Sequence, residues 1–241
     1  YGADWTSSHG GQNHFLNLVD EILKLGVKRL RISSIEPREV TQDLLDFLKE
    51  HDEVFCDHFH MPLQSGSDFI LKRMGRRYDT AKYYEVLCDV RNRFPRASIS
   101  ADVIPGFPGE TEEYAEETIR FIKKCSLSFL HVFPYSKRPN TRALRMPGHL
   151  SPEVISKRAT QLRALSQQLQ GQYNKMFIGE TLSVLWEKSY DSKGRIRGKT
   201  PNYLSVVCAD DKISPKTISQ ANLKGFVDKN TILVTLSDSS E

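Results

Sequence analysis

The sequence holds few cysteines, and they lie far from one another. Cys56, Cys88, Cys125 and Cys208 are separated by 32, 37 and 83 residues. These gaps match no short metal-binding motif. We therefore expect four free thiols, buried as small apolar side chains in a reducing compartment, and no metal site formed by this chain.

Long apolar runs are absent as well. No stretch approaches the ~18 residues that a membrane-spanning helix needs, so we expect no membrane partner and a cytoplasmic protein. With 39% hydrophobic and 27% charged residues, the 241 residues suit one sizeable domain and a smaller one. The chain opens on Tyr1 rather than on methionine, from which we expect that it begins inside a longer protein.

Acidic residues are scarce in one segment. Residues 137–175 hold eight basic side chains and one acidic side chain, whereas residues 1–136 hold 17 basic and 21 acidic ones. A local excess of this size predicts contact with a polyanion. The alternative is a solvated, charged helix face. The basic residues are Lys137, Arg138, Arg142, Arg145, Lys157, Arg158, Arg163 and Lys175.

The stretch from Ile99 to Thr111 predicts a strand, a tight turn and a helix in succession. Alternating apolar residues from 99 to 103 indicate a buried strand. Gly106 and Gly109, each preceded by proline, end it, and Thr111 is a helix N-cap followed by two glutamates. In a parallel α/β sheet such a turn lies at the carboxyl end of the strand, where ligands bind. The alternative is an ordinary strand-to-helix turn.

Strands and helices alternate through the first three quarters of the chain. We expect strands near residues 28–32, 54–63, 97–104 and 129–133, and helices over 15–25, 41–49, 70–74, 80–94, 111–125 and 151–173. A strand–helix repeat of ~30–40 residues is typical of a (βα) barrel. Four strands are too few for a closed eight-stranded barrel, so we expect an incomplete barrel that is open on one side.

The pattern changes near residue 175. Short strands are expected over 181–186, 194–199, 204–208 and 232–236, with turns between them. Four or five such strands in ~65 residues predict a small all-β barrel. We therefore divide the chain into a first domain, 1–175, and a second domain, 176–241.

Polar residues follow or line the predicted strands of the first domain. Glu36 is a candidate acceptor for a ligand hydroxyl, or a turn cap. Gln64 and Ser65 lie where the core of a barrel would meet its mouth. His58 and His60 alternate with an apolar residue and therefore face one side. Without a third ligand nearby, we do not expect them to bind metal.

One strand of the second domain carries alternating cations. Lys193, Arg195, Arg197 and Lys199 are expected on one face of a strand, solvated, with an apolar residue on the other face. Tyr203 follows closely and could stack on a base. We expect an RNA-binding surface, which the basic segment 137–175 would extend. The alternative is a charged, exposed strand edge.

Five motifs follow one another along the first domain. They are Leu30-Arg-Ile-Ser-Ser-Ile-Glu-Pro37, His60-Met-Pro-Leu-Gln-Ser-Gly-Ser-Asp68, Ile70-Leu-Lys-Arg-Met-Gly-Arg-Arg-Tyr78, Asp102-Val-Ile-Pro-Gly-Phe-Pro-Gly-Glu-Thr111 and Phe133-Pro-Tyr-Ser-Lys-Arg-Pro-Asn-Thr141. Together they resemble the radical-SAM methylthiotransferases. The tail, with Gly198-Lys-Thr-Pro-Asn-Tyr-Leu-Ser-Val206, resembles the TRAM module of those enzymes. The resemblance implies an α/β fold, an incomplete (βα) radical-SAM barrel followed by a small all-β, TRAM-like barrel.

Within this family, residues 33–37 and 62–67 are most similar to one branch. That branch inserts a methylthio group at C2 of threonylcarbamoyladenosine 37 of tRNA by radical S-adenosylmethionine chemistry. The branch that modifies isopentenyladenosine is an alternative. The ribosomal-protein branch usually has histidine where this chain has Ser65, so we disfavour it. Two further alternatives are an RNA-binding fragment without activity and a non-radical barrel enzyme that binds a phosphorylated small molecule at Gly106 and Gly109.

The resemblance also implies the site residues, although no catalytic acid or base can be assigned. Nearest S-adenosylmethionine we expect Glu36, Gln64, Ser65, Arg76, Asp102, Pro105, Gly106 and Phe107. Nearest the target base we expect Phe133, Tyr135 and Arg138. The implied RNA-binding residues are Lys193, Arg195, Arg197, Lys199 and Tyr203.

The implied cofactors are S-adenosylmethionine and two 4Fe–4S clusters, and the implied partners are tRNA, a sulfur donor and an electron donor. The family holds its catalytic cluster on Cys-x-x-x-Cys-x-x-Cys, a motif absent from this sequence. Four isolated cysteines cannot supply converging thiolates. We expect these ligands to precede Tyr1. On its own, this chain should then be inactive, bind no iron and bind S-adenosylmethionine weakly.

Overall fold

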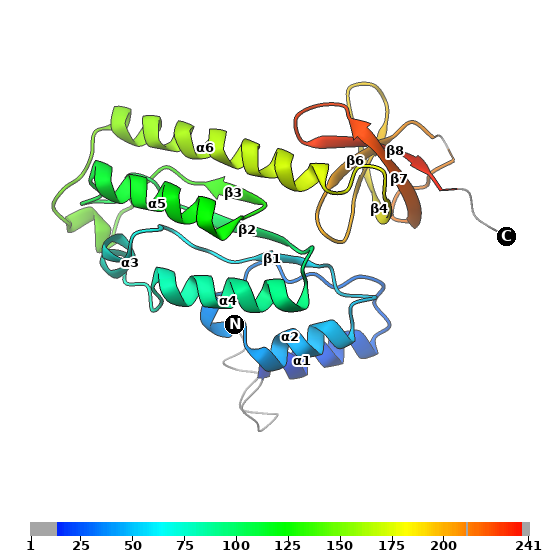
Figure 1. Cartoon of the computed structure of the whole chain (residues 1–241), viewed down its shortest axis with the longest axis horizontal. Helices are drawn as coiled ribbons and strands as arrows, with labels where there is room; N and C mark the ends of the chain where they lie inside the picture. The colour runs from blue at the N-terminus through cyan, green and yellow to red at the C-terminus, as the bar shows by residue number, and fades with distance from the viewer. Residues whose placement is uncertain (1–13, 211, 238–241) are drawn as a thin grey trace.

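The computed structural model describes residues 14–210 and 212–237, which form a sheet-and-helix unit followed by a small barrel (Figure 1). Helices and strands alternate in the first unit, with short 3₁₀ turns at Pro37–Glu39 and Ala143–Arg145. Its elements are α1 (His14–Lys24), α2 (Gln42–Glu50), β1 (His58–His60), α3 (Asp68–Met74), α4 (Thr80–Arg93), β2 (Ser98–Val103), α5 (Glu112–Cys125), β3 (Phe129–Val132) and α6 (Pro152–Lys175).

The sheet is parallel and open, in the order β1-β2-β3. An isolated bridge between Leu30 and Phe55 continues it at the β1 edge. The incomplete barrel is therefore confirmed, but the strand expected at 28–32 is reduced to that bridge and the one at 54–63 to three residues. Residues 28–32 lie at the edge of the sheet. Among the described residues they have a neighbour on one side only, and a single bridge forms there instead of a full strand.

The helices cover one face of the sheet, where the core lies (Figure 1). Ile99, Ala101 and Val103 of β2 are fully buried beside Leu45 of α2 and Leu162 of α6. Burying one such branched side chain stabilises the fold by about 1.5–3 kcal/mol. The residues that alternate with them on β2 point to the other face, which we call the inner face, and they are polar.

Local capping explains where α5 and α6 begin. Thr111 accepts a hydrogen bond from the backbone of Tyr114, and Ser151 accepts one from Val154. Pro152 then occupies the first position of α6, where its missing N–H leaves no bond unmade. Both helix starts were predicted from these residues. Because each cap acts within four residues, it is readable from the sequence alone.

The tail is a closed five-stranded barrel. Its strands β4 (Thr181–Tyr190), β5 (Ile196–Lys199), β6 (Ser205–Cys208), β7 (Ile218–Phe226) and β8 (Thr231–Leu236) follow the order β4-β5-β6-β8-β7. Trp186 fills its centre, and a side chain on Gly198 would come within 2.9 Å of that ring. The all-β tail is thus confirmed. The domain boundary at 175/176 stays a prediction, since Tyr173 and Phe177 both pack into the tail core.

Across the described ranges, no helix combines the length and apolarity needed to cross a membrane.

Candidate functional site

Two loops meet at the carboxyl end of the sheet, one after β1 and one after β2. The backbone N–H of Gln64 donates to the carbonyl of Asp102 at 2.7 Å, and the carbonyl of Gln64 accepts from Ile104 at 2.9 Å. Gln64 has φ of 68°, a conformation uncommon outside glycine. This turn brings Gln64 and Asp102, both expected near S-adenosylmethionine, into direct contact.

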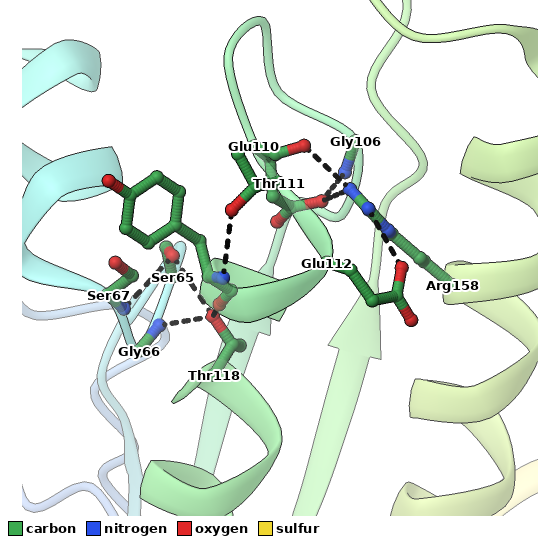
Figure 2. Close-up of polar contacts among 10 residues, drawn as sticks. Ser65, Gly66, Ser67, Gly106, Glu110, Thr111, Glu112, Thr118 and Arg158 are labelled. Atoms are coloured by element: carbon green, nitrogen blue, oxygen red, sulfur yellow. Dashed lines mark hydrogen bonds and ion pairs between the residues drawn. The ribbon is translucent and has the colours of Figure 1, made fainter. Parts of the chain in front are cut away.

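A threonine of α5 holds the loop after β1 (Figure 2). The hydroxyl of Thr118 accepts a hydrogen bond from the Gly66 N–H at 3.0 Å and lies 3.2 Å from the Ser65 hydroxyl. Ser65 in turn accepts from the Ser67 N–H at 3.2 Å. A Cβ on Gly66 would lie 2.8 Å from the Cα of Thr118, so only glycine fits. Ser65 therefore shapes the loop rather than facing open solvent.

The loop after β2 is fixed by its own glutamate (Figure 2). Gly106 has φ of 83°, and its N–H donates to a Glu110 carboxylate oxygen at 2.7 Å. A Cβ on Gly106 would lie 2.5 Å from Ile155 of α6. The loop thus packs directly on α6. Pro105 and Phe107 are buried in it, and the ring of Phe107 meets that of Tyr135 edge-on at 5.5 Å.

Arg158 of α6 completes this arrangement (Figure 2). Its guanidinium donates to a Glu110 carboxylate oxygen at 2.8 Å and to the Glu110 carbonyl at 3.0 Å. A second arm reaches Glu112 at 3.1 Å. Burial raises the pKa of Glu110, while the Gly106 amide and Arg158 oppose that shift. The sequence placed Arg158 in a polyanion-binding segment. This is wrong, because the side chain is 6% exposed and faces the Gly106 loop.

Glu36 and Arg76 face each other beside these loops. The Arg76 guanidinium lies 3.6 Å from a Glu36 carboxylate oxygen, and Arg38 lies 3.2 Å from the other oxygen. Burial raises the pKa of the nearby Tyr78 phenol to about 12. The charges of Arg76, Glu36 and Asp102 also act on this phenol. Glu36 also precedes the 3₁₀ turn at Pro37–Glu39. Glu36 is therefore held by two arginines, one of which, Arg76, is also a candidate site residue.

The inner face of the sheet carries a hydrogen-bonded chain of side chains. His60 reaches Asp102 at 3.1 Å through Nε2 and the Ser100 hydroxyl at 2.9 Å through Nδ1. The same hydroxyl lies 3.0 Å from Nε2 of His58. Burial lowers the pKa of His58 to about 3, so its imidazole is neutral. The two histidines share one side, as expected. The role of Ser100 was missed, although polar residues alternate along β2.

The residues expected near the target base follow β3. Phe133 is 54% exposed, and its N–H donates to the Val103 carbonyl at 2.9 Å. The Tyr135 N–H donates to Pro105 at 2.9 Å, while its buried hydroxyl has no partner among the described residues. Arg138 is exposed. The structure thus places the rings of Phe133 and Tyr135 next to the segment that leads from β2 into the Gly106 loop.

The described residues do not fit an iron–sulfur cluster but do fit a polar ligand. Three of the four cysteines are buried, and nothing within 14–210 and 212–237 gathers three or more His, Cys, Asp or Glu side chains suited to a metal ion. By contrast, the side-chain oxygens of Gln64 and Ser67 are buried without a partner in this part of the chain. Buried polar atoms normally find hydrogen bonds, so these two suit a ligand with donor groups.

The cations of β5 differ from the expected solvated row. Arg195 is held by Asp191, with 2.6 Å between their charged atoms, and its own N–H also binds that carboxylate. Lys199 is half-buried and donates to the Ser205 hydroxyl at 2.8 Å. Only Lys193 and Arg197 are exposed, and residues 191–195 form a turn rather than strand. The sequence missed the turn because Asp191 lies outside the alternating run.

Tyr203 is also differently placed. Its ring stacks on His58 of β1, with 4.5 Å between centroids, and the guanidinium carbon of Arg31 lies 3.7 Å from its centroid. Protein side chains thus occupy the ring that was expected to stack on a base. The basic loop 137–145 lies at the far end of α6 from the tail (Figure 1). It therefore does not continue the β5 surface directly.

Comparisons with known proteins agree with this geometry. A family model described as Radical SAM superfamily matches residues 9–122. Over 185 residues the chain is 41% identical to threonylcarbamoyladenosine tRNA methylthiotransferase MtaB of Bacillus subtilis, covering 76% of this chain and 41% of that protein. Over 164 residues it is 42% identical to tRNA-2-methylthio-N(6)-dimethylallyladenosine synthase of Corynebacterium urealyticum, covering 68% and 30%. The chain therefore spans less than half the length of these relatives.

A solved structure supports the fold alone. Coproporphyrinogen III oxidase (HemN) from Escherichia coli, a radical SAM enzyme, superposes with a TM-score of 0.54 at 21% identity. The superposition covers 66% of this chain and 38% of that one.

Proposed function

This chain belongs to the radical SAM methylthiotransferases, and on that basis we propose that it forms part of an enzyme that methylthiolates tRNA. We propose C2 of threonylcarbamoyladenosine 37 as the target. The observation that carries the proposal is the meeting of the Gln64 and Gly106 loops at the carboxyl end of the sheet, next to exposed Phe133. The proposed activity would need cluster ligands outside the described residues, which offer no cluster site.

S-adenosylmethionine would bind at the joined loops. The buried, unpartnered oxygens of Gln64 and Ser67 support this placement, because the cofactor carries amino and hydroxyl donors. We place Asp102, Glu36 and Arg76 at the border of the same site. Bound to a reduced cluster, the cofactor supplies the radical chemistry, and the protein supplies binding and orientation.

The substituent on the target base distinguishes the two tRNA branches. Threonylcarbamoyladenosine carries a carboxylate, whereas isopentenyladenosine carries only a hydrocarbon. The loop after β3 exposes Lys137 and Arg138, and neither has an ion-pair partner among the described residues. Free cations beside an exposed aromatic ring, Phe133, suit an anionic nucleoside. This charge favours the threonylcarbamoyl substrate.

The partners proposed are tRNA, a sulfur donor and an electron donor, all within the cytoplasm. Exposed Lys193 and Arg197 on the tail would contact phosphates. We do not propose that role for Arg195, Lys199 and Tyr203, because their side chains contact other side chains of the protein.

A cellular experiment tests the proposal. The complete protein that carries this chain is expressed in a bacterial strain that lacks its own threonylcarbamoyladenosine and isopentenyladenosine methylthiotransferases, and tRNA nucleosides are analysed by mass spectrometry. We expect the 2-methylthio derivative of threonylcarbamoyladenosine to return. A Gly106→Val variant should restore none, because its side chain would clash with Ile155. Methylthiolated isopentenyladenosine would point to the other tRNA branch. No modified tRNA would contradict the proposal.

A further inference from the structure

One aromatic side chain of the tail reaches the inner face of the sheet. The ring of Tyr203 lies 4.5 Å from that of His58, with 14° between their planes. His58 stacks in turn on Phe129 of β3, at 5.8 Å and 6°. Arg31 and Lys199 place their cations 3.7 Å and 4.1 Å from the Tyr203 centroid. The stack therefore runs from the tail into two strands of the sheet.

The turn that presents Tyr203 is itself tightly built. Tyr203 has φ of 69°, which side-chain-bearing residues rarely adopt. Its N–H donates to the Thr200 carbonyl at 3.0 Å, and the Thr200 hydroxyl accepts from Leu204 at 2.9 Å. Such a conformation persists only where its surroundings hold it. Here the surroundings are the sheet on one side and the Thr200–Leu204 turn on the other.

Two further links, one direct and one through Tyr173 of α6, join the tail to the first unit. Arg29 donates to the Lys199 carbonyl at 2.9 Å and to the Ser183 hydroxyl at 2.7 Å. Tyr173 donates to the Arg96 carbonyl at 2.8 Å and accepts from the Asn202 amide at 3.2 Å. The interface thus surrounds Tyr203 with polar bonds that fix its direction.

We propose that Tyr203 is a positioning residue that docks the tail barrel on the sheet. Its stack holds the exposed cations of the tail at one orientation relative to the Gln64 and Gly106 loops. This inference rests on the proposed function and deepens it, because a target nucleoside must be oriented closely for transfer to occur. The tyrosine acts through the interface and touches no substrate.

Amide hydrogen exchange of the 241-residue chain without RNA tests the docking. In Tyr203→Ala, amides of residues 29–31 and 199–204 should exchange about 10–100-fold faster, because ring stacking and a cation contact are lost. Tyr203→Phe should retain the wild-type rates, since the ring is kept. Tyr190→Ala removes an exposed tyrosine of the same barrel and should also change nothing there. Equal rates in Tyr203→Ala and Tyr190→Ala would overturn the proposal.

A milder variant covers the case in which Tyr203→Ala does not fold. Arg31→Gln removes the cation from the ring while altering only an exposed side chain. The same amides should exchange about two- to fivefold faster. Unchanged exchange in Arg31→Gln, with Tyr203→Ala unfolded, would count against docking by this stack.

Affinity for tRNA separates docking from direct base stacking. Tyr203→Ala should bind tRNA more weakly at an unchanged salt slope, together with the faster exchange. Weaker binding with unchanged RNA-free exchange would mean that Tyr203 stacks on RNA, and would overturn the proposal. If the wild-type chain binds no tRNA, the proposed function loses support, while the exchange experiment still decides the docking.

Discussion

The guanidinium of Arg158 lies 2.8 Å from a carboxylate oxygen of Glu110, and both side chains are almost completely buried. The same carboxylate accepts from the Gly106 N–H, so α6 holds the glycine loop through one charged pair. A buried pair contributes little net stability over an apolar pair, but breaking it leaves an uncompensated charge. Its structural consequence is to fix the loop that we assign to S-adenosylmethionine.

Removing the Arg158 guanidinium should therefore lower the stability of the fold. Arg158→Met is expected to lower the free energy of unfolding by about 3–5 kcal/mol, because Glu110 is left buried without the cation that pairs with it. Arg163→Met, an exposed position of the same helix, should change it by less than about 0.5 kcal/mol. Urea unfolding of both variants measures the difference. Equal stabilities would show that the pair does not hold the loop.

The hydrogen bond from the Gly66 N–H to the Thr118 hydroxyl predicts a smaller loss of stability. Thr118→Val keeps the side-chain shape but leaves the buried Gly66 N–H without its acceptor. We expect a loss of about 1–3 kcal/mol in unfolding free energy. Thr160→Val, at an exposed position of α6, is the matched control. If the urea unfolding midpoint of Thr118→Val matched that of the control, the stabilising role of this hydrogen bond would be contradicted.

His58 predicts a specific pH dependence. Burial lowers its folded pKa to about 3, below the ordinary 6.5, so below pH 6.5 the unfolded chain binds a proton that the folded chain does not. Stability from this residue is present above pH 6.5 and is lost as pH falls toward 3. His58→Phe keeps a ring for Tyr203 and removes the proton site. Relative to this variant, the wild type should lose about 2 kcal/mol between pH 7 and pH 5. Parallel curves in urea unfolding would refute this assignment.

Two arginines of the tail, Arg195 and Arg197, should respond differently to substitution. Arg197→Ala should weaken tRNA binding and lower the salt slope by about one phosphate contact. Arg195→Ala should instead loosen the 191–195 turn, because it removes the guanidinium that donates to the Asp191 carboxylate at 2.7 Å. Filter binding across salt concentrations, with circular-dichroism melting, separates the effects. An unchanged slope in Arg197→Ala would remove β5 from the RNA surface.

The sequence predicted those parts of the fold that local chemistry determines. Thr111 and Ser151 cap their helices within four residues, and alternating apolar residues mark β2. The open barrel was also predictable, because too few strand patterns occur in the first domain. By contrast, the segment at 28–32 depends on a neighbour that local patterns do not reveal, and within the described part of the chain its one bridge is that of Leu30 with Phe55.

The site was predictable in its loops but not in the contacts that hold them. Gln64 and Gly106 stand out because of strand ends and glycines. Arg158 looked like a surface charge, since its partner is 48 residues away in the chain. Tyr203 looked like an RNA contact, and its stack on His58 spans an even longer separation. Pairings at such distances are fixed by tertiary packing, which residue spacing does not encode.

The central claim is best tested by a reaction with defined RNA. The complete protein is reconstituted anaerobically with iron, sulfide and a reductant. It then receives S-adenosylmethionine and anticodon stem-loops carrying threonylcarbamoyladenosine, isopentenyladenosine or adenosine at position 37. Mass spectrometry follows each RNA. The account predicts that the threonylcarbamoyl RNA gains one methylthio group fastest, and that Lys137→Ala/Arg138→Ala reduces this preference. Preferred modification of the isopentenyl RNA, or none in any RNA, would contradict it.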